Sequence, residues 1–172
     1  MFHVERIIKS KNNTIKTTLF LGLLLLISCI ATRQTIQIPD YILEPNGKEV
    51  IGKKSLTAFI FENNQKNSPI ENYLSSKFKT DNYLEKEFCV NISKDKYKII
   101  VYDAADFEKY FNSSNYAMIN QLPDNAKVGD SRKFIAISMI NSFNEDCLAE
   151  GSLFQNIATK YLKTLKDEYY NQ

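Results

Sequence analysis

This sequence of 172 residues contains one histidine, His3, no tryptophan and only five glycines. Catalysis by Ser-His-Asp or Cys-His groups needs an imidazole base that works near neutral pH, and beyond residue 3 the chain has none. The commonest zinc and non-haem iron sites also use imidazole ligands. No P-loop, GxGxxG or CxxC pattern is present. We therefore expect no catalytic residues of these types, no metal and no cofactor.

A large excess of charge of one sign is also lacking. The chain has 22 Lys and Arg against 20 Asp and Glu, and the excess of basic residues lies before residue 17. Residues 29–172 hold 18 basic and 19 acidic side chains, with the two signs interspersed. Nucleic-acid binding calls for a basic patch or stripe. We therefore expect no nucleic-acid partner.

An apolar run, Leu19–Ile27, follows a basic N-terminal stretch and ends at a small residue, Ser28. The basic residues before the run are Arg6, Lys9, Lys11 and Lys16. This order of charged, apolar and small residues is typical of a secretory signal. The run is too short for a membrane span, which needs roughly 20 apolar residues. The sequence therefore predicts export.

The end of this run, Leu26-Ile27-Ser28-Cys29, resembles the lipobox of bacterial lipoprotein precursors. The resemblance implies that residues 1–28 are a signal peptide and that Cys29 carries a lipid that anchors the protein to a bilayer. The alternatives are an ordinary signal peptide and an uncleaved anchor. Family members kept at the inner membrane often have Asp at the position of Ile30, and others reach the cell surface through an acidic run after the cysteine. Neither feature is present, which implies an outer-membrane protein that faces the periplasm.

The rest of the chain has the length of one domain. We expect a polar tether over residues 29–40 and a single domain over residues 41–172. Its two cysteines, Cys89 and Cys147, form a candidate disulfide, since exported proteins meet an oxidising compartment. The alternative is two buried thiols that act as small apolar side chains.

Hydrophobic periodicity predicts an α+β fold of order β-α-β-β-α-β-α. The expected strands cover residues 56–62, 87–92, 97–102 and 134–140. The expected helices cover residues 69–79, a short segment capped by Asp103, and residues 152–169. Asn46-Gly47 also indicates a hairpin within residues 41–51. We expect one antiparallel sheet with helices packed on one side, and the ferredoxin-like fold has the same order of elements.

Two segments are candidates for function. Residues 112–132 form a long loop, in which Tyr116 and Met118 fit no helix or strand period and are candidates for contact with a partner. Residues 144–150 hold an acidic cluster at the end of a buried strand. It is interpreted as a solvated loop, with a metal site or a carboxylate base as the alternative.

Three functional hypotheses follow. The first is a non-enzymatic envelope lipoprotein that serves as a binding, accessory or structural module, with an envelope protein as a candidate partner, and the missing catalytic motifs favour it. The second is a periplasmic enzyme that uses carboxylates, and its candidates are Asp103, Asp106, Glu145 and Asp146. The third is a small-ligand-binding protein with the 112–132 loop as a lid.

Overall fold

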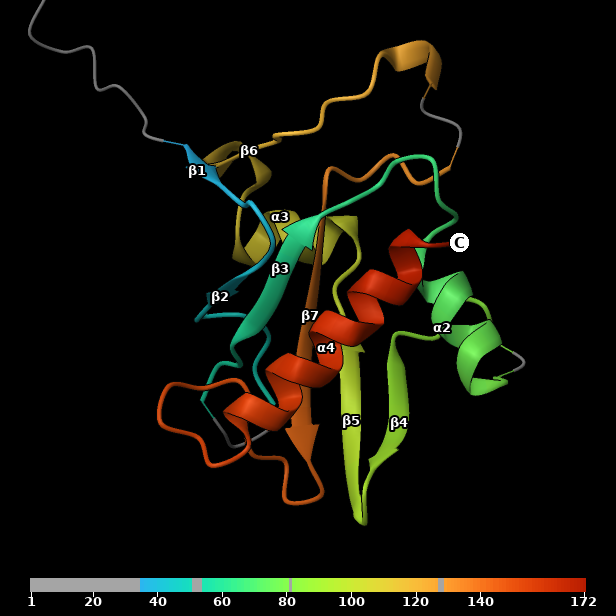
Figure 1. Cartoon of the computed structure of the whole chain (residues 1–172). Coiled ribbons are helices and arrows are strands. Elements are labelled where there is room, and N and C mark those ends of the chain that lie inside the picture. Colours follow the sequence, from blue (N-terminus) through green and yellow to red (C-terminus); the bar gives the residue numbers. More distant parts are fainter. Residues whose placement is uncertain (1–34, 51–53, 81, 127–128) are drawn as a thin grey trace, which may run out of the picture. The chain divides into compact units, whose positions relative to one another are not determined.

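A five-stranded antiparallel sheet is the centre of the fold (Figure 1). The computed structural model describes residues 35–50, 54–80, 82–126 and 129–172, so the expected signal peptide and Cys29 lie outside the described residues. The strands, in their order across the sheet, are β2 (Ile42–Glu44), β3 (Ala58–Glu62), β7 (Phe134–Asn141), β5 (Asp95–Val101) and β4 (Glu87–Ile92). Every neighbouring pair is antiparallel. The α+β class and the antiparallel sheet are confirmed.

The helices are α2 (Ile70–Phe78), α3 (Ala104–Tyr110) and α4 (Gln155–Tyr170). Two 3₁₀ turns, η1 (Ser113–Asn115) and η2 (Asp124–Ala126), lie in the long loop between α3 and β7. This loop also holds β6 (Tyr116–Ala117), which pairs in parallel with β1 (Ile36–Gln37). None of the helices in the described ranges has the length and apolar character needed to cross a bilayer.

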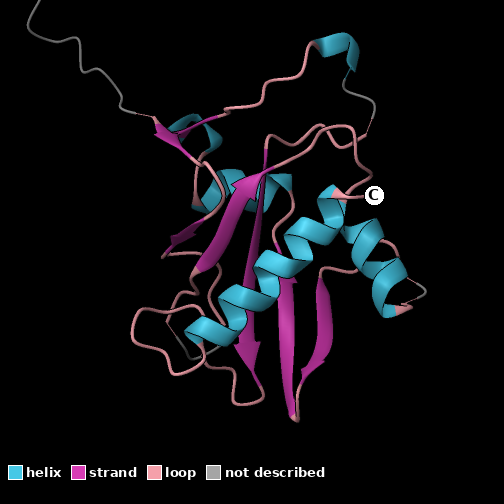
Figure 2. Cartoon of the chain, in the orientation of Figure 1, coloured by secondary structure: helices cyan, strands magenta, loops and turns pink. Residues whose placement is uncertain are grey.

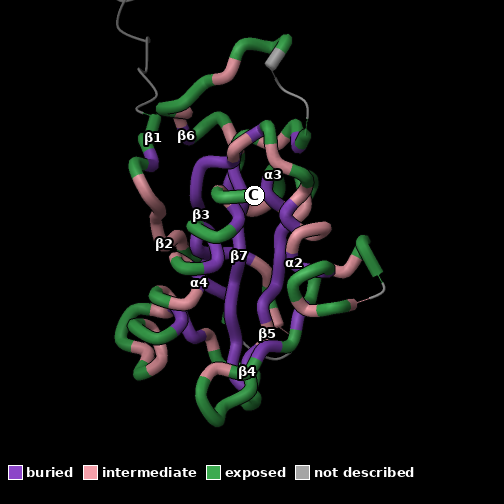
Figure 3. Tube along the Cα trace, turned by 45° about the vertical axis from the view of Figure 1, so that its right-hand side comes forward, coloured by how far each residue is buried: buried purple, intermediate pink, exposed green. Residues whose placement is uncertain are grey.

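The two central strands, β3 and β7, are buried along their whole length (Figure 3). Alternate side chains of a strand point to opposite faces of a sheet. Phe59 and Ile135 belong to a first core together with α2 and α4, whereas Ile60 and Ala136 belong to a second core together with α3. The sheet therefore has an apolar core on each face.

The prediction that all helices pack on one side is correct for α2 and α4 and wrong for α3. Figure 2 shows α4 in front of the sheet and α3 behind it. The physical reason is that Phe107 and Phe111 of the α3 region cover the second apolar face of β3 and β7. When a strand has apolar side chains on both faces of the sheet, other elements must bury both of these faces.

The ferredoxin-like arrangement is not confirmed. A split βαβ unit has two parallel strands with one strand between them. Here two strands, β7 and β5, lie between β3 and β4, so β3 and β4 run antiparallel. The Asn46-Gly47 turn is also not a simple hairpin, because β2 pairs with β3 rather than with the residues just after the turn.

The N-terminal segment 35–40, which we expected to be part of a tether, belongs to the compact unit Thr35–Gln172. Ile36 pairs with Tyr116 in the β1–β6 ladder, and Ile38 is buried in the second core. Asp40 forms ion pairs with two lysines of α4, Lys163 and Lys166. Residues 35–40 therefore pack as part of the domain rather than as a free tether.

Helix α4 provides a test of the first core. Leu162 is 1 % exposed, and Leu153, which comes just before α4, is 93 % exposed. Leu162→Ala should lower the free energy of unfolding by about 2–5 kcal/mol, because it leaves a cavity in a packed core. The matched change Leu153→Ala should cost less than about 0.5 kcal/mol. Urea unfolding of a fragment that begins at Thr35 measures both, and equal losses would contradict the assignment of the core.

Candidate functional site

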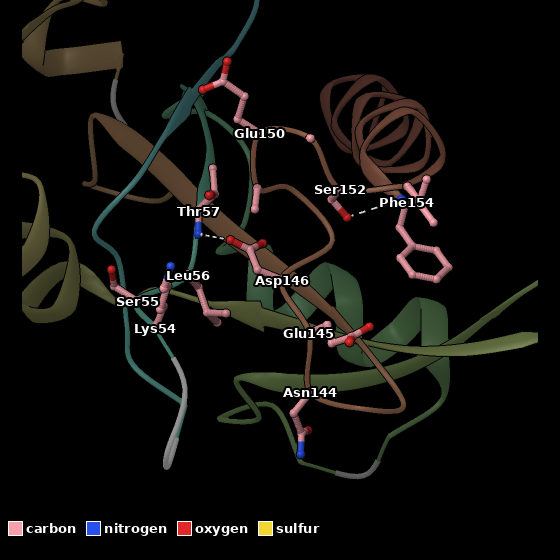
Figure 4. A pocket seen from close by; sticks show the side chains of 13 residues that line it. Lys54, Ser55, Leu56, Thr57, Asn144, Glu145, Asp146, Glu150, Ser152 and Phe154 are labelled. Carbon is pink, nitrogen blue, oxygen red and sulfur yellow. Dashed lines mark hydrogen bonds between the residues drawn. The ribbon is translucent and has the colours of Figure 1, made fainter.

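An open cleft of about 510 Å³ lies between the chain that leads into β3 and the loop that joins β7 to α4 (Figure 4). Residues 54–57 form one wall, and residues 144–146 and 149–154 form the other. The acidic cluster expected at residues 144–150 lines this cleft. Glu145 and Asp146 therefore lie at one concave site, as the carboxylate hypothesis requires.

Asp146 joins the two walls of the cleft. One of its carboxylate oxygens accepts a hydrogen bond from the backbone N–H of Thr57 at 2.7 Å, and the other accepts one from Leu148 at 2.8 Å. Figure 4 shows the bond to Thr57 as a dashed line. Both oxygens thus hold the backbone in place. The geometry gives Asp146 a structural role.

The other carboxylates of the cleft do not converge with Asp146. Glu145 accepts a hydrogen bond from the side-chain amide of Asn141 at 2.8 Å. In Figure 4 the carboxylate of Glu150 points away from that of Asp146. Among the residues that the structure describes, no group of three or more His, Cys, Asp or Glu side chains could hold a metal ion.

Asp103 and Asp106 lie outside the cleft. Asp103 caps α3 by accepting a hydrogen bond from the backbone N–H of Asp106, as predicted, and it pairs with Lys86. The hydrogen bond from Lys86, followed by that from the Asp106 backbone, lowers the pKa of Asp103 to about 2. Asp106 pairs with Lys48 at 2.7 Å. The four candidate carboxylates are therefore divided between two places.

A buried chain of hydroxyl groups supports the other side of Thr57. Ser138 donates to the carbonyl oxygen of Thr57 at 2.8 Å, so its own oxygen accepts a hydrogen bond from the Tyr102 hydroxyl, 2.9 Å away. Tyr102 in turn accepts from the backbone N–H of Lys48 at 2.8 Å. Gly47 leaves room for this hydroxyl, since a β-carbon there would clash with it. Our sequence reasoning missed this group, and its only signal was one serine in the apolar run 134–140.

A buried ion group anchors the end of the long loop. The guanidinium of Arg132 donates to both carboxylate oxygens of Glu71 at 2.7 Å and also to Asp130. Burial opposes the charge, but the hydrogen bonds to the two carboxylates outweigh this effect and raise the pKa of Arg132. All three side chains are largely buried, and each of the two carboxylates is paired with Arg132. The group therefore ties the start of β7 to the start of α2.

Residues 116–120 of the long loop are held in place, and this corrects the assignment of Tyr116. Tyr116 is 8 % exposed and its ring centroid lies 5.6 Å from that of Phe134, so Tyr116 is a core residue rather than a surface contact. Met118 is half-buried against the same core. The buried carboxylate of Glu62 accepts the backbone N–H groups of Ile119 at 2.9 Å and Asn120 at 2.7 Å. This attachment argues against a lid at residues 116–120.

The candidate disulfide between Cys89 and Cys147 is not formed, and both are free thiols. Cys89 is exposed on β4, and it alternates with Phe88 and Val90, which point into the first core. Cys147 is buried in that same core. The two thiols thus lie on opposite sides of the sheet. Burial, and then the nearby carboxylates of Asp146 and Glu145, raise the pKa of Cys147 to about 12.

No family model, curated protein or solved structure matches this chain.

The two thiols should differ strongly in reactivity. In a fragment that begins at Thr35, iodoacetamide at pH 8 should alkylate Cys89 readily, whereas Cys147 should react only after unfolding, because alkylation needs an accessible thiolate. Mass spectrometry of digested protein measures both sites. Cys89→Ser is the control and should abolish the fast reaction. Two unreactive cysteines that become labelled only after reduction would instead show a disulfide.

Asp146 provides a test of the structural role of the cleft carboxylates. Asp146→Asn replaces one acceptor oxygen by an amide donor that faces a backbone N–H, so it should lower the free energy of unfolding by about 1–3 kcal/mol. Glu150→Gln, in an exposed position of the same cleft, should change it by less than about 0.5 kcal/mol. Thermal or urea unfolding compares the two. An unchanged stability for Asp146→Asn would leave this carboxylate available for chemistry.

Proposed function

We propose that this chain is a bacterial envelope lipoprotein, acylated at Cys29, whose folded domain is a non-enzymatic binding or accessory module. The observation that carries the proposal is the lipobox-like sequence Leu26-Ile27-Ser28-Cys29 at the end of a short apolar run. The compact unit begins at Thr35, six positions after Cys29. This spacing fits a domain that follows its lipid anchor directly. Position 30 is an isoleucine rather than an acidic residue, and this supports a location at the outer membrane with the domain in the periplasm.

The geometry of the cleft supports binding rather than catalysis. Asp146 uses both carboxylate oxygens to hold the backbone, and Glu150 points away from it. Leu153, which lines the cleft, is 93 % exposed, and Phe143, beside the cleft residue Asn144, is 75 % exposed. Large apolar side chains that stand in solvent at the edge of an open cleft favour contact with another protein. We therefore propose an envelope protein as the partner of this cleft.

A small ligand is the second candidate for the cleft. Its volume, about 510 Å³, falls within the range of ligand pockets in proteins. A bound compound would stabilise the folded state and raise its melting temperature by mass action. Such a shift in a metabolite screen would favour a ligand over a protein partner.

Replacement of Cys29 tests the lipoprotein proposal. Cys29→Ala should block acylation, so the protein should stay as a precursor that contains residues 1–28 or should leave the membrane fraction. Intact mass and partition into detergent measure the two outcomes. Cys89→Ser is the matched control and should be processed like the parent protein. An unchanged mass and an unchanged membrane fraction for Cys29→Ala would contradict the proposal.

A further inference from the structure

The path of the chain at Thr35 is fixed by three contacts. Strand β1 pairs with β6 at the positions Ile36–Tyr116 and Gln37–Ala117. Ile38 is 2 % exposed in the second core, and Asp40 is paired with Lys163 and Lys166 of α4. Residues 35–40 therefore cannot move away from the domain without breaking these contacts. The chain joins the domain at one defined end, where β1 and β6 lie (Figure 1).

The segment between the proposed anchor and this end is short. Thr35 comes six positions after Cys29, and an extended chain spans at most about 3.5 Å per residue, so Thr35 lies within roughly 20 Å of the acylated residue. Strand β7 starts at the β1–β6 end, where Phe134 contacts Tyr116, and runs for eight residues toward the cleft. At about 3.3 Å per residue it covers roughly 25 Å. The cleft thus lies about one strand length from the end that the anchor holds near the bilayer.

The β1–β6 end also carries exposed apolar side chains. Ile36 is 47 % exposed, and Ile119, two positions beyond β6, is 49 % exposed. Ile119 is held in place because Glu62 accepts its backbone N–H. Apolar side chains fixed at a surface gain free energy when they enter the boundary between lipid headgroups and acyl chains.

We infer that the β1–β6 end of the domain rests on the lipid bilayer, with Ile36 and Ile119 in contact with it, and that the cleft faces away from the membrane. This inference rests on the proposed acylation of Cys29. The bilayer is the occupant of this end because the segment before Thr35 keeps the end within roughly 20 Å of the acylated residue, and because Ile36 and Ile119 are exposed there. The cleft, formed at the other end by residues 54–57 and 144–154, is then open to a partner in the periplasm.

Site-specific fluorescence on the acylated full-length protein tests this orientation. In a Cys89→Ser background, Cys147 is buried and Cys29 carries its lipid, so an environment-sensitive label can be placed at Ile119→Cys or, at the cleft end, at Phe143→Cys. The protein is reconstituted into phosphatidylcholine vesicles with or without doxyl-labelled lipid. Emission from position 119 should fall by roughly half and shift to the blue, whereas emission from position 143 should stay almost unchanged. Ile36→Cys provides a second position at the same end, in case Ile119→Cys does not fold.

The possible outcomes distinguish a failure of the proposed orientation from a failure of the proposed acylation at Cys29. An acylated protein with equal quenching at both ends, or with quenching at position 143 alone, would overturn the orientation and leave the lipoprotein proposal intact. A protein without lipid by mass spectrometry, which does not float with the vesicles, would overturn both. The labelled fragment that begins at Thr35 is the control, and its label at position 119 should show no quenching.

Discussion

Strands β3 and β7 lie side by side at the centre of the sheet, and both present apolar side chains to both faces. The positions of the other elements follow from the need to cover these two faces. Helices α2 and α4 bury the face of Phe59 and Ile135, whereas α3, Tyr116 and Ile38 bury the face of Ile60 and Ala136. The second face explains why residues 35–40 and the part of the long loop around Tyr116 belong to the domain, since Ile38 and Tyr116 each contribute a side chain to it.

The same burial determines how the polar residues of these strands are used. A buried polar group without a partner costs free energy, so each one must form hydrogen bonds. Glu62 at the end of β3 binds the backbone at residues 119 and 120, and Ser138 within β7 binds Thr57 and Tyr102. Asn141 at the end of β7 accepts the N–H groups of Phe143 and Glu145. Each polar residue of the central strands thus fixes a loop, and two of these loops form the cleft.

Local sequence patterns predicted most of the helices and strands. The contacts between segments that are distant in the sequence could not be predicted from such patterns. The strand at 87–92 and the cap at Asp103 follow from alternation and from one side chain, and both are observed. A continuous apolar strand such as β7 does not show which neighbour it pairs with or which face a helix covers, so the sheet order and the position of α3 were missed. The acidic cluster was found because its residues are close in the chain. Its structural role could not be predicted, because the partner of Asp146 is Thr57, 89 positions away in the sequence.

The two ends of the domain carry different features. One end receives the chain at Thr35 and carries Ile36 and Ile119, and the other carries the cleft and the exposed side chain of Leu153. Strand β7 links them, since Phe134 packs at the first end and Asn141 holds the loop at the second. Because this strand is fully buried and paired on both edges, the distance between the ends is rigid. If the β1–β6 end rests on the bilayer, as proposed, the length of β7 sets how far the cleft stands from the membrane surface.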